Sequence, residues 1–178
     1  MNGPEILHLI RHDLQRAVAG RGKPPTPRPM DVSPWLAMSI MQKAKAIRRG
    51  REDLALGAAA TLLRDAPDKL WRRIGCIAYE DVGVASVQAV GLATAALAGK
   101  QARAALGGAW AVASCVVSEL CRAPKCRAAD DLVMVCELHP AQADARAELP
   151  LLTTRELIAF ATGREARQEL EDEYLDEG

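Results

Sequence analysis

Residues 72–86 read RRIGCIAYEDVGVAS, a helical pattern that runs into two adjacent carboxylates and then a glycine. At about 100° per residue, one stripe of a helix opened by Pro67 collects the side chains of Leu70, Ile74, Ile77, Ala78 and Asp81. Asp81 therefore points inward, whereas Glu80 lies on a flank beside Arg73. This segment predicts a buried helix followed by a sharp turn at Gly83, because glycine adopts conformations that other residues avoid.

An inward carboxylate in the last turn of a helix is disfavoured by desolvation and by the negative end of the helix dipole. Asp81 thus needs a cation or several hydrogen-bond donors. The candidates are Lys43, Lys45, Arg48, Arg49, Lys125 and the free N–H groups of a helix that starts near Ser86.

A catalytic acid/base pair would need both carboxyl groups to face one cleft. The helical wheel separates Glu80 from Asp81. We therefore expect these two residues, with Gly83 and Arg73, to form a structural anchor, and we predict no catalytic residue.

Composition predicts an all-α protein. The 178 residues are 49% hydrophobic and only 3% aromatic, and Ala, Leu, Arg and Glu are abundant. These residues lose little rotamer freedom in a helix. We expect a bundle of about seven to nine helices and no strand, with helices over residues 4–19, 35–49, 52–64, 67–82, 86–98, 102–122, 125–138, 153–162 and 165–175.

Local signals support several of these helix starts. Ser33 is suited to be an N-cap with Pro34 at the first helical position. Thr153 or Thr154 is suited to cap a helix with Glu156 in its first turn.

Four segments follow along the chain. Residues 1–20 form a helical arm, and residues 21–33 form a Pro-rich linker that lets the arm dock on the body or on another subunit. Residues 34–140 form the helical core, centred on the uncharged stretches 86–98 and 104–118. Residues 141–178 form acidic C-terminal helices.

Charge is distributed unevenly. Residues 1–130 contain 19 Lys and Arg against 11 Asp and Glu, whereas residues 131–178 contain 4 against 12. The excess is eight positive charges in the first part and eight negative charges in the second. Such a division indicates either an anionic partner for the basic part or an acidic tail that folds back onto it.

A basic surface is the first alternative to a purely structural interpretation. The residues that could contact nucleic-acid phosphates or a protein partner are Lys43, Lys45, Arg48, Arg49, Arg72, Lys125 and Arg127, together with Arg51, Lys69, Arg73 and Arg122. They could equally form a solvated face that neighbouring acids partly neutralise.

A metal site is the second alternative. Its candidate ligands are Cys115, Cys121, Cys126, Cys136 and His139, and separately Glu5, His8 and His12. The cysteines do not form paired knuckles and the histidines lack an evident further ligand. We therefore predict no metal and no cofactor.

The cysteine usage and the N-terminus favour the cytoplasm. Five cysteines without framework spacing fit a reducing compartment. The first residues lack the features of a signal peptide. Residues 82–99 are uncharged but too rich in small and polar residues for a membrane span, so they predict a buried helix.

Three segments resemble, in the same order and at similar separations, parts of one family. These are KAKAIRRGREDLAL (43–56), WRRIGCIAYEDVGVAS (71–86) and RAPKCRAADDL (122–132). The family is the replication-associated recombination, or maintenance-of-genome-stability, AAA+ ATPases, which are related to clamp loaders. The resemblance covers about residues 38–138 and implies a collar-like helical module that mediates oligomer assembly at sites of DNA replication or repair.

The departures from the family bear on activity. The chain has no G-x-x-x-x-G-K-[ST] loop, and too few residues precede the matched region for an ATPase core. Arg48-Arg49-Gly50 carries an extra arginine, and the sequence departs from the family after Lys125. ATP hydrolysis is therefore not carried over.

The leading hypothesis is a stand-alone oligomerisation or protein-interaction module without enzymatic activity. Its partner would be a second copy of the chain or a separately encoded AAA+ ATPase, and no membrane is involved. The alternatives are a nucleic-acid-binding accessory protein that uses the Lys/Arg face, and a metal-dependent enzyme that uses the Cys and His residues.

Overall fold

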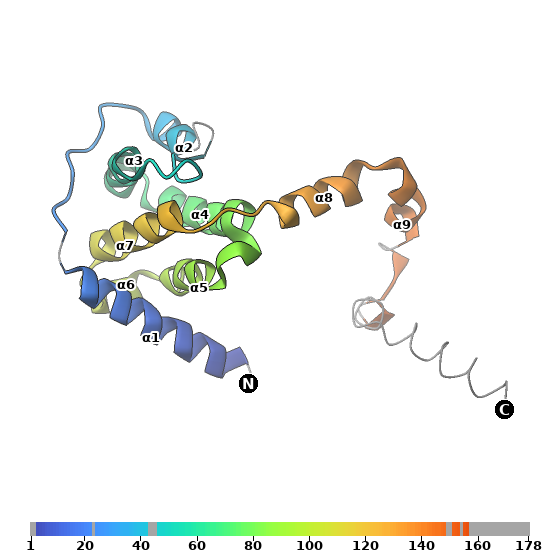
Figure 1. Cartoon of the computed structure of the whole chain (residues 1–178), viewed down its shortest axis with the longest axis horizontal. Helices are drawn as coiled ribbons and strands as arrows, with labels where there is room; N and C mark the ends of the chain where they lie inside the picture. Colours follow the sequence, from blue (N-terminus) through green and yellow to red (C-terminus); the bar gives the residue numbers. More distant parts are fainter. Residues whose placement is uncertain (1–2, 23, 43–45, 149–150, 154, 157–178) are drawn as a thin grey trace. The chain divides into compact units, whose positions relative to one another are not determined.

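The computed structural model describes residues 3–22, 24–42, 46–148, 151–153 and 155–156. Helices, turns and connecting segments make up these residues, and none of them forms a strand (Figure 1). The predicted all-α fold is confirmed, with a number of helices that agrees with the expected seven to nine. Within this described part, no helix is both long enough and apolar enough to cross a membrane.

The chain divides into two compact units, Met1–Asp130 and Asp131–Gly178. The boundary coincides with the change in the sign of charge, so the first unit carries the excess of positive charge and the second the excess of negative charge. Helix α8, Ala128–Leu138, spans the boundary. The first unit thus includes the residues expected to form the arm and linker, and it ends before residue 140.

Helix α7, Ala109–Arg122, is the centre of the first unit. It packs against α1, α3, α5 and α6, and in Figure 1 it lies between α3 and α5. Every residue from Ala111 to Ser118 is buried. The small side chains of this stretch let the surrounding helices approach closely.

The helix expected over residues 102–122 is in fact two helices. α6 covers Lys100–Ala105, and α7 begins only at Ala109. Between them, Gly107 and Gly108 have φ angles of 94° and 100°. These left-handed conformations end the first helix and favour glycine.

Helix α1, Gly3–Arg21, packs on α5 and α7 of the same chain. Its Leu14 and Val18 are buried in the common core. The following linker is also attached to the body, because the Trp110 indole donates to the Pro24 carbonyl at 3.3 Å and the Met30 N–H donates to Thr61 Oγ1 at 2.8 Å. In this structure the arm docks on its own body.

Helices α2, Pro34–Gln42, and α3, Glu52–Asp65, pack against each other. The hydroxyl of Ser33 accepts the Leu36 N–H at 3.3 Å, as its predicted N-cap role requires. The helix expected over 35–49 is shorter, because residues 46–50 form a turn. Gly50 closes that turn with a φ of 66°.

Helices α4, Pro67–Ile77, and α5, Val87–Ala96, complete the first unit. Leu70, Ile74 and Ile77 of α4 are fully buried. Arg103 of α6 lies 4.1 Å above the Trp71 ring and donates to the Ala96 carbonyl at 2.8 Å. This one side chain therefore joins α6 to α4 and caps the end of α5.

The second unit contains most of α8, a 3-10 turn at Pro140–Gln142 and α9, Ala143–Glu148. Thr153 and Glu156 form a reciprocal cap: Thr153 Oγ1 accepts the Glu156 N–H at 3.4 Å, and Glu156 accepts the Thr153 N–H at 2.6 Å. Most of the helix expected over 153–162 and all of that over 165–175 lie outside the described residues.

Candidate functional site

The two carboxylates of the opening segment lie in a π-helical turn, Ala78–Val82, that continues into a 3-10 turn, Gly83–Ser86. The wider π winding shifts the register that a regular helix would have. Val82 is therefore fully buried, whereas Asp81 is half-buried and Glu80 is exposed. Asp81 is thus only partly buried and not fully inward as expected, because the wheel assumed regular α-helical winding.

Asp81 contributes to the fold mainly through its backbone. The Cys126 N–H donates to the Asp81 carbonyl at 2.9 Å. Gly83 has a φ of 48°, and a Cβ there would lie 3.3 Å from the Cys126 carbonyl oxygen. The turn after α4 is thus fastened to the segment that follows α7, and only a residue without a side chain fits easily at Gly83.

Lys125 satisfies the carbonyl groups at the end of α7. Its Nζ donates to the Cys121 carbonyl at 3.2 Å and also to the Ala123 carbonyl. Burial lowers the pKa of this ammonium group, and the charge of Asp81 opposes part of that shift. Lys125 therefore acts on the helix end more than on Asp81. Lys43 and Lys45, which were also candidate partners, lie outside the described residues.

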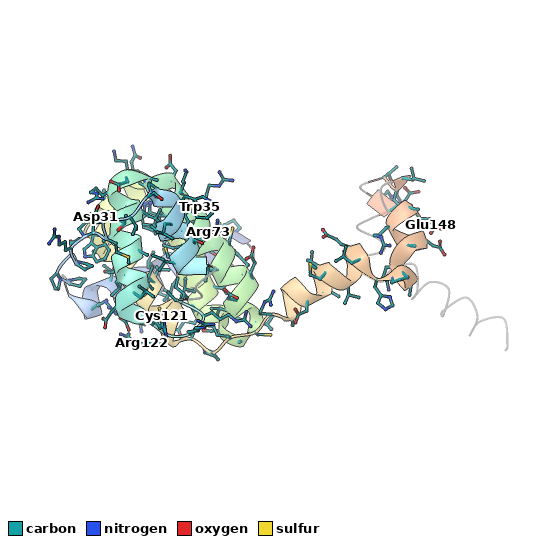
Figure 2. The ribbon with its side chains drawn as sticks, turned by 90° about the horizontal axis from the view of Figure 1, so that it is seen from above. Asp31, Trp35, Arg73, Cys121, Arg122 and Glu148 are labelled. Atoms are coloured by element: carbon teal, nitrogen blue, oxygen red, sulfur yellow. The ribbon has the colours of Figure 1, made fainter. Side chains whose placement is uncertain are left out.

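The end of α7 is where the three family-like segments meet. A Cβ at Gly50 would lie 3.5 Å from the Cys121 carbonyl oxygen, so the turn before α3 approaches the same helix end as Lys125 does. Gly83 approaches Cys126, four residues after α7 ends. Cys121 and Arg122 mark this position in Figure 2. These segments therefore pack near one helix terminus.

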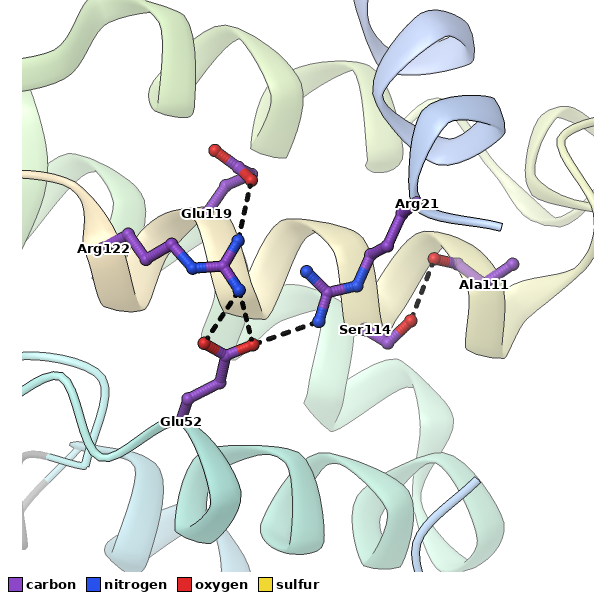
Figure 3. Close-up of polar contacts among 6 residues, drawn as sticks. All are labelled: Arg21, Glu52, Ala111, Ser114, Glu119 and Arg122. Atoms are coloured by element: carbon purple, nitrogen blue, oxygen red, sulfur yellow. Dashed lines mark hydrogen bonds and ion pairs between the residues drawn. The ribbon is translucent and has the colours of Figure 1, made fainter. Parts of the chain in front are cut away.

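A carboxylate that the sequence did not single out lies beside this helix end. Glu52 lies at the start of α3. Its Oε1 accepts a hydrogen bond from Arg21 Nη2 at 3.0 Å, and both of its carboxylate oxygens accept from Arg122 Nη2 at 3.1 Å (Figure 3). Arg122 also approaches Glu119 at 3.5 Å. Glu52 consequently links α1, α3 and α7. An acidic residue in the first turn of a helix was the signal in the sequence, but its partners are far away along the chain.

The electrostatics of Glu52 favour its charged form. Burial by itself would raise the pKa of this carboxyl, but Ser118 and the two guanidinium groups outweigh burial and lower it. The position at the N-terminus of α3 also favours a negative charge.

The candidate basic residues do not all remain available for a partner. Arg49 and Arg72 are exposed, whereas Arg48 and Arg127 are half-buried. Lys125 and Arg122 make the internal contacts described above. Arg73, expected beside Glu80, is half-buried on α4.

The candidate metal ligands are dispersed. Among the residues that the structure describes, no three Cys, His, Asp or Glu side chains lie close enough to hold a metal ion, and this includes the groups around Cys115 and His8. Burial raises the pKa of the Cys115 thiol and raises that of Cys121 to about 11. Both thiols therefore stay protonated at neutral pH, which disfavours metal ligation and nucleophilic attack.

Helix α8 exposes a group of large apolar side chains. All residues of this helix from Asp131 onward are exposed. We call its five large apolar side chains the α8 surface: Leu132, Val133, Met134, Val135 and Leu138, each between 47% and 65% exposed.

The C-terminal end of α8 is well defined by hydrogen bonds within its own unit. Arg146 Nη1 of α9 donates to the carbonyls of Cys136 and His139, each at 2.9 Å. His139 Nδ1 accepts the Ala141 N–H at 3.2 Å and thereby caps the 3-10 turn. The α8 surface is thus held on an ordered helix–turn–helix.

Comparisons with protein-family models, with curated proteins and with solved structures found no match to this chain. The resemblance of residues 38–138 to the AAA+ family stays a prediction.

We expect Gly83→Ala to lower the free energy of unfolding by about 1–2 kcal/mol, because alanine is strained at positive φ and would crowd the Cys126 carbonyl. Glu80→Ala and Asp81→Ala should cost less, since both retain the backbone contacts. Chemical denaturation of each variant measures the difference. Gly20→Ala is the matched control: a Cβ there meets nothing within 4 Å, and alanine favours the helix. An equal loss for Gly83 and Asp81 would contradict this assignment.

We expect Glu52→Gln to destabilise the protein by about 1–2 kcal/mol at pH 7. Because the folded pKa of Glu52 is lowered, its charged form stabilises the fold above the unfolded pKa, and this stabilisation is lost as pH falls through the folded value. The stabilities of wild type and variant should therefore converge in acid. Glu119→Gln, which removes only a 3.5 Å contact with Arg122, should have little effect at either pH.

Proposed function

We propose that this chain is a protein-association module that binds other protein chains through the α8 surface and catalyses no reaction. The observation that carries the proposal is the exposure of five large apolar side chains on one short helix. Contiguous exposed apolar patches mark interaction sites in water-soluble proteins.

Helix stability supports the same proposal. α8 has 11 residues, and isolated helices of this length are marginal in water. Packing of an apolar face against another protein would supply the missing stabilisation. The first unit, by contrast, already buries the apolar faces of α4 and α7 within itself.

The resemblance to the AAA+ family extends the proposal to a biological setting. It favours assembly of this module with itself or with a separately encoded ATPase, at sites of DNA replication or repair. The absence of the phosphate-binding loop from the sequence supports a non-enzymatic role for the chain itself.

We expect the double variant Leu132→Glu/Val135→Glu to weaken association at least about tenfold, because charges would enter an apolar interface. Light scattering over a concentration series measures self-association, and affinity capture followed by titration measures association with other proteins. Val84→Glu, at a valine that is 76% exposed on the first unit, is the matched control. Equal association by both variants would overturn the role of α8.

Nucleic-acid binding is the second candidate function, and the excess positive charge of the first unit favours it. If it applies, Arg49→Glu/Arg72→Glu should weaken binding to forked or single-stranded DNA at least about tenfold, and the wild-type affinity should fall steeply with salt. Mobility-shift titrations at two salt concentrations test this. The α8 double variant should bind DNA like the wild type, which separates the two functions.

A further inference from the structure

We infer that the α8 surface binds α8 of a second copy of this chain, and that the two helices pack antiparallel about a two-fold axis at Val135. The inference rests on the proposed function and specifies its partner.

One face of α8 has the pattern that such a pair needs. At about 100° per residue, Leu132 and Leu138 lie about 60° to either side of Val135, which gives an apolar stripe about 120° wide. All three side chains are exposed. In an antiparallel pair centred on Val135, Leu132 of one copy faces Leu138 of the other, and Val135 faces itself.

Hydrogen-bond complementarity favours the antiparallel direction. Asp131 precedes Val135 by four residues, and His139 follows it by four, so each Asp131 faces His139 of the second copy. Both are exposed. Because His139 Nδ1 accepts the Ala141 N–H, the neutral ring carries its hydrogen on Nε2, which is then oriented away from that cap as a donor.

The ends of the helix reinforce this choice. Arg146 donates to the carbonyls of Cys136 and His139 at the C-terminal end of α8, so the Asp131 end of one copy meets an end of the other that carries a guanidinium group. Antiparallel helix dipoles also attract. A parallel pair would instead place Asp131 against Asp131.

Disulfide cross-linking of the full chain tests the geometry. In a background where the exposed Cys76 and Cys136 are replaced by serine, Leu132→Cys and Leu138→Cys are prepared with tags of different mass. On oxidation, the mixture should form the Leu132–Leu138 heterodimer about tenfold faster than either variant forms a homodimer, because proximity raises effective concentration. Val135→Cys alone should cross-link efficiently across the axis.

A charge swap provides a second, non-covalent measurement. His139→Asp retains a side chain that caps the 3-10 turn but places two carboxylates together, so sedimentation should show self-association weakened several-fold. Adding Asp131→His in the same chain restores the pairing of a carboxylate with an imidazole and should restore the dimer. A merely structural effect of His139→Asp would not be rescued.

The outcomes separate this inference from the proposed function. Association in which Leu132→Cys alone cross-links as fast as the mixture overturns the antiparallel self-pairing but leaves α8 as an interaction surface. A monomer at every concentration also overturns the inference. If, in addition, no captured protein is sensitive to Leu132→Glu/Val135→Glu, the proposed function fails as well.

Discussion

The first unit depends on how the C-terminal end of α7 is satisfied. The last carbonyl groups of a helix have no partners within the helix. At α7, Lys125 supplies an ammonium group to the Cys121 carbonyl, and the turn at Gly50 packs against the same carbonyl. The turn at Gly83 packs closely against Cys126, just beyond the helix. Helices α1, α3, α5 and α6 all pack against α7. Stabilising the end of α7 therefore stabilises the arrangement of the helices around it.

Much of this arrangement could be predicted from the sequence where local chemistry decides structure. The all-α class followed from composition, and the Ser33 and Thr153 caps followed from hydroxyls placed before helical segments. The inward stripe of α4 was correct as far as Ala78. Beyond that residue the winding changes, and a fixed angle per residue no longer describes which side chain faces the core.

Other features could not be predicted because they depend on residues distant along the chain. Glu52 is an ordinary acidic residue at a helix start until the fold brings Arg21 and Arg122 to it. Gly107 and Gly108 each favour a turn, but the continuous apolar pattern around them favoured a single helix. The exposure of α8 could not be predicted for a related reason. An apolar segment indicates that its side chains are buried, but the sequence alone does not say whether they are buried within the same molecule or against another one.

The π turn between Ala78 and Val82 also matters for how this segment is compared with others. A π turn corresponds to one residue more than a regular helix of the same length needs, and removing that residue would rotate everything after it by about 100°. Consider a protein with a regular α-helix at this point. Its alignment with residues 71–78 would differ by one position from its alignment with the residues after Gly83. A structural alignment would therefore require a gap of one position near Glu80-Asp81, even where the residues on either side are identical.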